Sequence, residues 1–484
     1  MSLLRGALHL GSLELICTLL RFARTVLLAR ALGVEEFGVA NTVLILVALA
    51  DAFSNLGLAQ FVIRDREGDS PRVTATVQTM VLVRGLATAA LIWIFAAPIA
   101  AMLGQPELVD MYRLVGIVAA VPALLHIEVA RVQRAMNFRL MAQVECLGLA
   151  VSVLAVAPIL LVVADARAMV VFLLAERALK VIASLWLHDV PFRLGWDRAA
   201  AWRAWRFGWP ILLAAPVSFL TLQGDRLVVA NRFDAADLGQ LSAALTLAVT
   251  PTMMLARVLG PLFLSALSRA RVVASADSPA VDRAASDAAL LALEAHMVVA
   301  AGSVVAVAIG GPAAVLLIFG PSFGPGAELI GLAGLLAAIP VIRGAFVTVS
   351  VSDGRTIEPL IANLPRLLAV PLALLAAIEG AGLVAVLLIG LAGEAAGVCV
   401  ALGFFARRYR GVGVLRRLAP GLALTAVVLL AVLALQAIGQ AALFGLPLPP
   451  LWAAVGLVAL LGALLWQCRA LRAQAAARLG RGRD

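Results

Sequence analysis

Five arginines lie deep within apolar stretches of this 484-residue chain. An ionised side chain at the centre of a membrane helix costs about 2.5–3.5 kcal/mol, so five lipid-facing arginines would cost on the order of 12–17 kcal/mol. We therefore expect them to face water or partner groups in an internal cavity. Guanidinium groups bind phosphate and pyrophosphate oxygens in pairs, whereas a structural ion pair or a side chain that reaches the interface is the alternative, above all for Arg84 and Arg343. The five are Arg24, Arg84, Arg257, Arg343 and Arg366.

Acidic and amide side chains occur in the same stretches. Asp51 and Asn55 are expected one helical turn apart, where they could bind a coupling cation or sugar hydroxyls, or simply hydrogen-bond to a neighbouring helix. Asp225 and Glu394 are candidates for gating or ion coupling, Glu394 as a proton site.

The spacing of Glu176 and Lys180 is that of a local ion pair on one helix face.

The elements that must position these residues are membrane helices, because a spanning helix needs about 20 apolar residues. The composition agrees, with 63% hydrophobic and 14% charged residues. We predict an all-α polytopic membrane protein with about 14 helices. These are expected at 8–32, 37–63, 73–103, 108–130, 140–163, 168–188, 207–231, 238–266, 288–310, 327–352, 357–378, 382–405, 418–438 and 448–468.

Arginines fall almost entirely in every second break between these helices, while the opposite breaks hold only Arg167 and Arg232. Basic residues stay on the cytoplasmic side of a bacterial inner membrane, so both termini are expected in the cytoplasm. The net charge of +10 is then explained by loop orientation and contact with anionic lipids. No nucleic-acid partner is expected. The four cysteines show no disulfide or metal-site spacing.

The predicted helices divide into two similar halves. We expect six-helix bundles at 1–188 and 207–410, joined by a cytoplasmic amphipathic linker at 189–206, with two extra helices and a basic cytoplasmic tail at 411–484. The segment Val26–Gly38 aligns without gaps onto Leu227–Gly239, at an offset of 201 residues. An even number of helices separates the copies, so the repeats run parallel. The same offset aligns Arg24 with Asp225, and we hypothesise that these two side chains pair until substrate phosphate competes for Arg24.

Four segments carry a family resemblance: LARALGVEEFGVANTVLIL (28–46), QRAMNFR (133–139), GDRLVVANRFDAADLGQLSAALTLAVTP (224–251) and LLIFGPSFGPGAELI (316–330). They resemble the polysaccharide (Wzx-type) flippases of the multidrug/oligosaccharidyl-lipid/polysaccharide (MOP) superfamily. One departure is Leu241, where family members usually have tyrosine. The resemblance implies a non-enzymatic transporter that moves undecaprenyl-pyrophosphate-linked oligosaccharide units to the periplasmic leaflet for exopolysaccharide or O-antigen (lipopolysaccharide) synthesis. Membrane lipids and a polysaccharide polymerase are the other partners that it suggests, and no cofactor is expected, with proton or sodium coupling left open.

Three alternatives remain at this point. A multidrug cation antiporter of the same superfamily should have an acidic, aromatic cavity, whereas this chain has two tyrosines and interior arginines. A membrane-embedded polymerase or glycosyltransferase usually carries a large periplasmic loop or an Asp-x-Asp motif, and neither occurs in this sequence. If the chain is a flippase, lipid II is an alternative substrate.

Overall fold

The computed structural model describes residues 2–135, 137–272, 279–353, 355, 357–408, 414–438, 441–443, 446–448 and 451–468. Nearly all of these residues are helical. The α-helices are α1 (Ser2–Phe53), α2 (Leu58–Arg64), α3 (Pro71–Met102), α4 (Val109–Ala120), α5 (Glu128–Arg131), α6 (Arg139–Leu154), α7 (Val156–Val162), α8 (Arg167–Trp186), α9 (Arg198–Arg232), α10 (Ala235–Val272), α11 (Pro279–Phe319), α12 (Gly324–Ser352), α13 (Ile357–Ile378), α14 (Leu383–Arg408), α15 (Val414–Ile438) and α16 (Leu451–Gln467).

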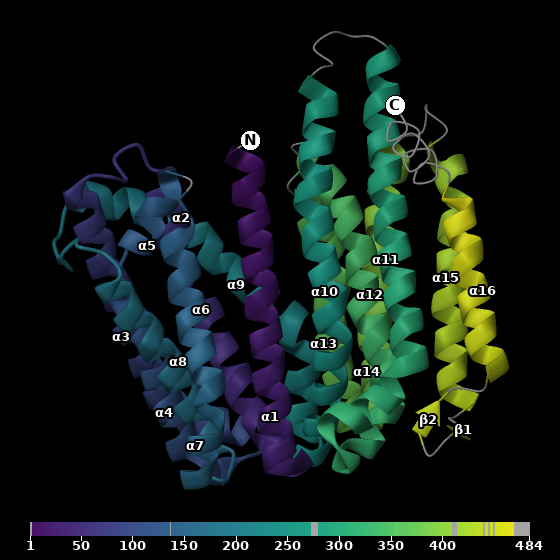
Figure 1. The fold of residues 1–484 in the computed structure, drawn as a ribbon, viewed down its shortest axis with the longest axis horizontal. Helices are drawn as coiled ribbons and strands as arrows, with labels where there is room; N and C mark the ends of the chain where they lie inside the picture. The colour runs from purple at the N-terminus through teal and green to yellow at the C-terminus, as the bar shows by residue number, and fades with distance from the viewer. Residues whose placement is uncertain are drawn as a thin grey trace. The chain divides into compact units, whose positions relative to one another are not determined.

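Short elements complete the chain that the structure describes. They are the 3-10 helices η1 (Pro106–Leu108), η2 (Val121–Leu124), η3 (Val132–Ala135) and η4 (Pro321–Phe323), and the antiparallel strands β1 (Ala441–Leu443) and β2 (Leu446–Leu448). The strands form a hairpin at one end of α15 and α16 (Figure 1). The predicted basic tail from residue 469 and the break at 409–413 lie outside the described residues.

The protein is an α-helical, multi-pass membrane protein. Among the described residues nine helices are long and apolar enough to cross a membrane, or up to eleven if each of two bent helix pairs is one span. Fewer than the fourteen predicted helices are counted as spans, and features of individual helices explain the difference. Helix α1 contains two of them, which meet at a kink where Gly33 has φ 78°, a conformation that favours glycine. Helix α8 carries several charges, and α16 has only 17 residues.

Two predicted helices are bent in the structure. The segment expected at 140–163 consists of α6 and α7, which meet at 46°, and the segment at 108–130 bends by 54° between η2 and α5. Pro158 and Pro122 lie next to these bends. Proline removes a backbone donor and clashes with the carbonyl one turn earlier, which accounts for the break before α7 and for the change from α4 to η2 ahead of the second bend.

The chain forms two compact units, Met1–Gly239 (unit 1) and Gln240–Asp484 (unit 2). In unit 1, α1 packs against α4, α6, α8 and α9, and α3 packs against α4 and α9. In unit 2, α11 packs against α12, α15 and α16, while α14 packs against α12 and α13. Residues 189–197, the first part of the predicted linker, are not helical. Asp197 caps the first turn of α9 by accepting a hydrogen bond from the Ala200 amide at 2.8 Å, so the linker's helical part belongs to α9.

The internal repeat corresponds to a reciprocal contact inside unit 1. A methyl group on Gly38 would overlap the carbonyl oxygen of Ala235, and one on Gly239 would overlap the carbonyl oxygen of Val34. Both pairs of equivalent residues are separated by the repeat offset of 201. Each turn therefore packs on the other in the same way, as expected for two copies related by an axis.

Candidate functional site

A ladder of five charged side chains crosses α1, α6 and α8 in unit 1. Arg24 of α1 forms a buried ion pair with Oε2 of Glu176, whose Oε1 lies 2.8 Å from Nζ of Lys180. Lys180 also lies 2.9 Å from Oε2 of Glu145 on α6, and the same oxygen lies 3.5 Å from Arg21. The ladder holds three cations and two carboxylates, so these five residues sum to one positive charge.

Helical spacing explains how the ladder is built. Arg21 and Arg24 are three residues apart on α1, and Glu176 and Lys180 are four apart on α8, so each pair shares a helix face. The predicted ion pair between Glu176 and Lys180 is confirmed. Gly148 of α6 makes room for the ladder, because a methyl group there would overlap the Lys180 side chain.

A second ion pair in unit 1 involves Asp51. Its two carboxylate oxygens lie 3.2 and 2.7 Å from the two terminal nitrogens of Arg177 on α8, a bidentate arrangement. Asp51 also exerts an electrostatic attraction on Arg84 of α3. The expectation that Asn55 lies on the same helix face as Asp51 was wrong, because α1 ends at Phe53.

Asn55 instead belongs to the break before α2. Its side-chain oxygen accepts a hydrogen bond from the amide of Gly57 at 3.0 Å, and Gly57 has φ 60°, in the left-handed region. The predicted helix 37–63 is therefore two helices, the end of α1 and the start of α2, separated by a break that includes Gly57.

Unit 2 contains a buried charge triad. One oxygen of Glu394 on α14 lies 3.2 Å from Arg343 of α12, and the other lies 3.2 Å from Arg366 of α13. Arg343 also donates a hydrogen bond to the side chain of Asn363. All three charged residues were predicted as site candidates, and the structure brings them together. The triad, defined as Arg343, Arg366 and Glu394, again sums to one positive charge.

Close packing of α13 on α14 makes the triad possible. A methyl group on Gly393 would overlap the Ala369 side chain, and one on Gly397 would overlap the Ala362 carbonyl oxygen. Both glycines flank Glu394 on α14, so the backbone of α13 approaches the carboxylate closely enough for Arg366 to reach it.

The ladder and the triad share one geometry. In each, a glutamate on the last helix of a predicted half places its two oxygens on two different cations, Glu176 in unit 1 and Glu394 in unit 2. Buried charges that are paired and hydrogen-bonded avoid most of the cost of desolvation. Two cations fixed around one pair of oxygens are also the arrangement that binds phosphate.

The remaining predicted residues lie elsewhere. Asp225 is buried on α9, and its pairing with Arg24 stays a prediction; the partner that the structure gives Arg24 is Glu176. Arg257 lies on α10 in unit 2 and is exposed. Arg21, Glu145 and Arg177 were not predicted as site residues. Glu145 stands near the start of a predicted helix, whereas Arg21 and Arg177 lie well inside predicted helices.

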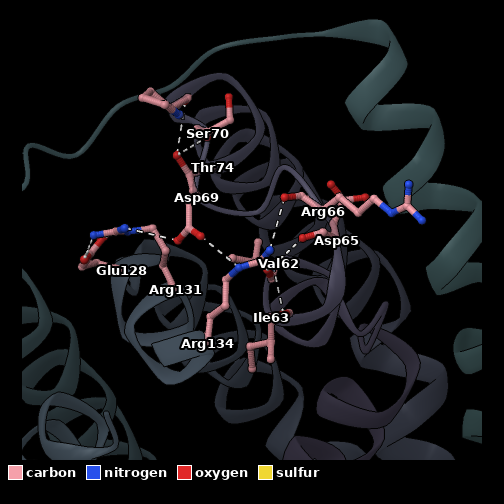
Figure 2. Close-up of polar contacts among 11 residues, drawn as sticks. Val62, Ile63, Asp65, Arg66, Asp69, Ser70, Thr74, Glu128, Arg131 and Arg134 are labelled. Carbon is pink, nitrogen blue, oxygen red and sulfur yellow. Dashed lines mark hydrogen bonds and ion pairs between the residues drawn. The ribbon is translucent and has the colours of Figure 1, made fainter. Parts of the chain in front are cut away.

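A second polar cluster lies at one end of unit 1 and explains the motif at 133–139. Arg134 donates hydrogen bonds to the carbonyl oxygens of Val62 at 3.3 Å and Ile63 at 3.1 Å, and lies 2.9 Å from Asp69 (Figure 2). It also donates to the carbonyls of Asp65 and Arg66. These carbonyl groups belong to the last turn of α2 and to the turn that follows it, so this arginine holds the two together and stabilises the fold.

Comparison with known proteins identifies the family and the fold. A family model described as "Polysaccharide biosynthesis protein" matches residues 27–320. No curated protein matches by sequence. The lipid II flippase MurJ in an inward closed conformation superposes with a TM-score of 0.69 at 13% identity, covering 97% of this chain and 99% of MurJ.

Two further solved structures are similar. An inward-facing MATE family multidrug resistance transporter of the MOP superfamily has a TM-score of 0.64 at 16% identity, covering 81% of this chain and 94% of that one. A MOP superfamily transporter from Pyrococcus furiosus has a TM-score of 0.50 at 15% identity, covering 85% and 95%. The chain therefore has the fold of the MOP superfamily transporters.

Proposed function

The chain belongs to the polysaccharide biosynthesis protein family, and from this premise we propose that it flips undecaprenyl-pyrophosphate-linked oligosaccharide units across the bacterial inner membrane. The units would be delivered to the periplasmic leaflet for exopolysaccharide or O-antigen synthesis, with both termini of the transporter in the cytoplasm. The resemblance of four motifs to Wzx-type flippases supports this substrate class.

The observation that carries the proposal is the sign of the buried charge. The ladder in unit 1 and the triad in unit 2 each hold one cation more than carboxylates, and Arg24, Arg343 and Arg366 are buried. A site of this sign attracts an anion and repels an organic cation. This favours a pyrophosphate headgroup over the substrates of a multidrug cation antiporter.

The mechanism we propose is alternating access. The buried arginines would neutralise the pyrophosphate while the polyprenyl tail stays in lipid. Rocking of two helix bundles would then expose the sugar to the periplasm. With roughly two negative charges moving outward, an inside-negative potential of 100 mV would favour transfer by about 4–5 kcal/mol.

The test is transfer of a short undecaprenyl-pyrophosphate oligosaccharide across proteoliposomes that contain the purified protein. Parallel samples receive lipid II and a fluorescent organic cation, and protein-free liposomes set the background. Transfer of the oligosaccharide lipid above background is expected. Transport of the cation alone would overturn the proposal. Transfer of lipid II alone would show that lipid II, and not the undecaprenyl-pyrophosphate oligosaccharide, is the substrate.

A further inference from the structure

Glu176 occupies the place of an anion. Its two oxygens contact Arg24 and Lys180 as two oxygens of a phosphate group would, and both contacts are charge-assisted. Any anion that binds these two cations must therefore compete with a carboxylate that is already present. In unit 2 Glu394 stands in the same relation to Arg343 and Arg366.

The ladder becomes more buried toward Glu176. The exposed fraction of the side chain falls from 43% at Arg21 and 32% at Glu145 to 17% at Lys180, and to 10% and 9% at Arg24 and Glu176. An incoming anion can thus exchange partners stepwise, first at Arg21 and then at Lys180, before it reaches the innermost pair. No step leaves a cation of the ladder without an anionic neighbour.

Charge balance determines what happens to the displaced carboxylate. Three cations of the ladder face two carboxylates: Arg21 and Arg24 of α1 and Lys180 of α8 face Glu145 of α6 and Glu176 of α8. The thiols of Cys17 and Cys146 lie close to Arg21 and Glu145. Adding an anion of about two negative charges makes these groups net negative while both glutamates stay ionised. A carboxylate that has lost its cations in a buried site binds a proton from water instead.

We propose that Glu176 is an internal competitor of the pyrophosphate: the headgroup binds Arg24 and Lys180 by displacing the Glu176 carboxylate, which takes up one proton as it leaves. This inference rests on the proposed function and adds a coupling between substrate binding and protonation. Glu176 is thus a specificity-determining residue, because it keeps the cations occupied until an anion of higher charge arrives.

The test uses the full-length protein in nanodiscs with inorganic pyrophosphate as the probe. Isothermal titration calorimetry in two buffers of different ionisation enthalpy gives the affinity and the number of protons bound. Glu176→Gln should bind pyrophosphate at least about tenfold more tightly than the wild type and should take up one proton fewer. Comparing the two proteins removes the protons that pyrophosphate itself exchanges.

Glu128→Gln is the matched control, because Glu128 is a buried glutamate of unit 1 that pairs with Arg131 outside the ladder. Its affinity and proton uptake should equal those of the wild type. Glu176→Asp, which keeps the charge on a shorter side chain, should bind more tightly than the wild type and retain proton uptake. It serves as a second variant if Glu176→Gln does not fold.

Three results would overturn the inference. The Glu176 variants could bind pyrophosphate no more tightly than the wild type, Glu176→Gln could take up as many protons as the wild type, or none of the proteins could bind pyrophosphate. Such a result, with wild-type transfer of the lipid-linked oligosaccharide intact, leaves the proposed function standing. Absence of that transfer overturns the proposed function itself.

Discussion

Arg24 of α1 and Glu176 of α8 form a buried ion pair although 152 residues separate them in the sequence. The pair keeps a charged guanidinium buried within unit 1, with a carboxylate as its partner. Arg343 and Arg366 are buried in the same manner against Glu394. Three of the five intramembrane arginines therefore contact a buried carboxylate, whereas their position in an internal cavity stays a prediction.

Arg24→Met should destabilise the protein more than the double variant Arg24→Met/Glu176→Met. The single change leaves Glu176 buried with one cation fewer, and breaking a buried pair costs about 3–5 kcal/mol, whereas apolar replacement of both partners is often neutral. Thermal unfolding in detergent measures the difference. A double variant that is less stable than the single one would show that the ion pair contributes net stability.

Glu394→Gln should lower the unfolding temperature strongly, because it leaves two buried guanidinium groups side by side. Inorganic pyrophosphate should restore part of the lost stability by taking the place of the carboxylate. The control is Glu379→Gln, since Glu379 is exposed between α13 and α14. Equal unfolding temperatures for the two variants would contradict this account of the triad.

Gly38→Ala and Gly239→Ala should have matching effects, because each methyl group would press on the other repeat's backbone. We expect each to cost about 1–3 kcal/mol, the usual penalty of overpacking. Gly302→Ala is the control, as nothing lies within 4 Å of a methyl group at that helical position. Thermal unfolding of the three variants checks the prediction, and a large effect at only one of the two turns would speak against the symmetric contact.

Arg134→Ala should destabilise the end of unit 1 by about 1–3 kcal/mol, because it removes the donor that links the last turn of α2 to the turn after it. Arg134→Lys should recover only part of the loss, because an ammonium group cannot reproduce the spread of the guanidinium donors. Unfolding temperature and proteolysis of the turn at 65–70 measure the effect. Arg139→Ala, at an exposed arginine of the same motif, should leave both unchanged.

The sequence predicted the helices and the buried charges for a physical reason. A charge inside a long apolar segment is conspicuous, and so Arg24, Arg343, Arg366 and Glu394 could be identified as buried candidates. Their partners could not, because pairing depends on the rotation and packing of helices far apart in the chain. Asn55 was misplaced because the break between α1 and α2, which includes the left-handed Gly57, interrupts the helix without changing the apolar pattern of the sequence.

The measurement that tests the central claim most directly is the initial rate of lipid-linked oligosaccharide transfer in proteoliposomes by Arg24→Gln and Arg366→Gln. Each variant is reconstituted at equal amounts and checked for folding, with Arg139→Gln as the control that removes an exposed arginine. The account predicts at least about a tenfold loss of rate for both buried arginines and an unchanged rate for the control. Wild-type rates in folded Arg24→Gln and Arg366→Gln would show that the buried arginines only stabilise the fold.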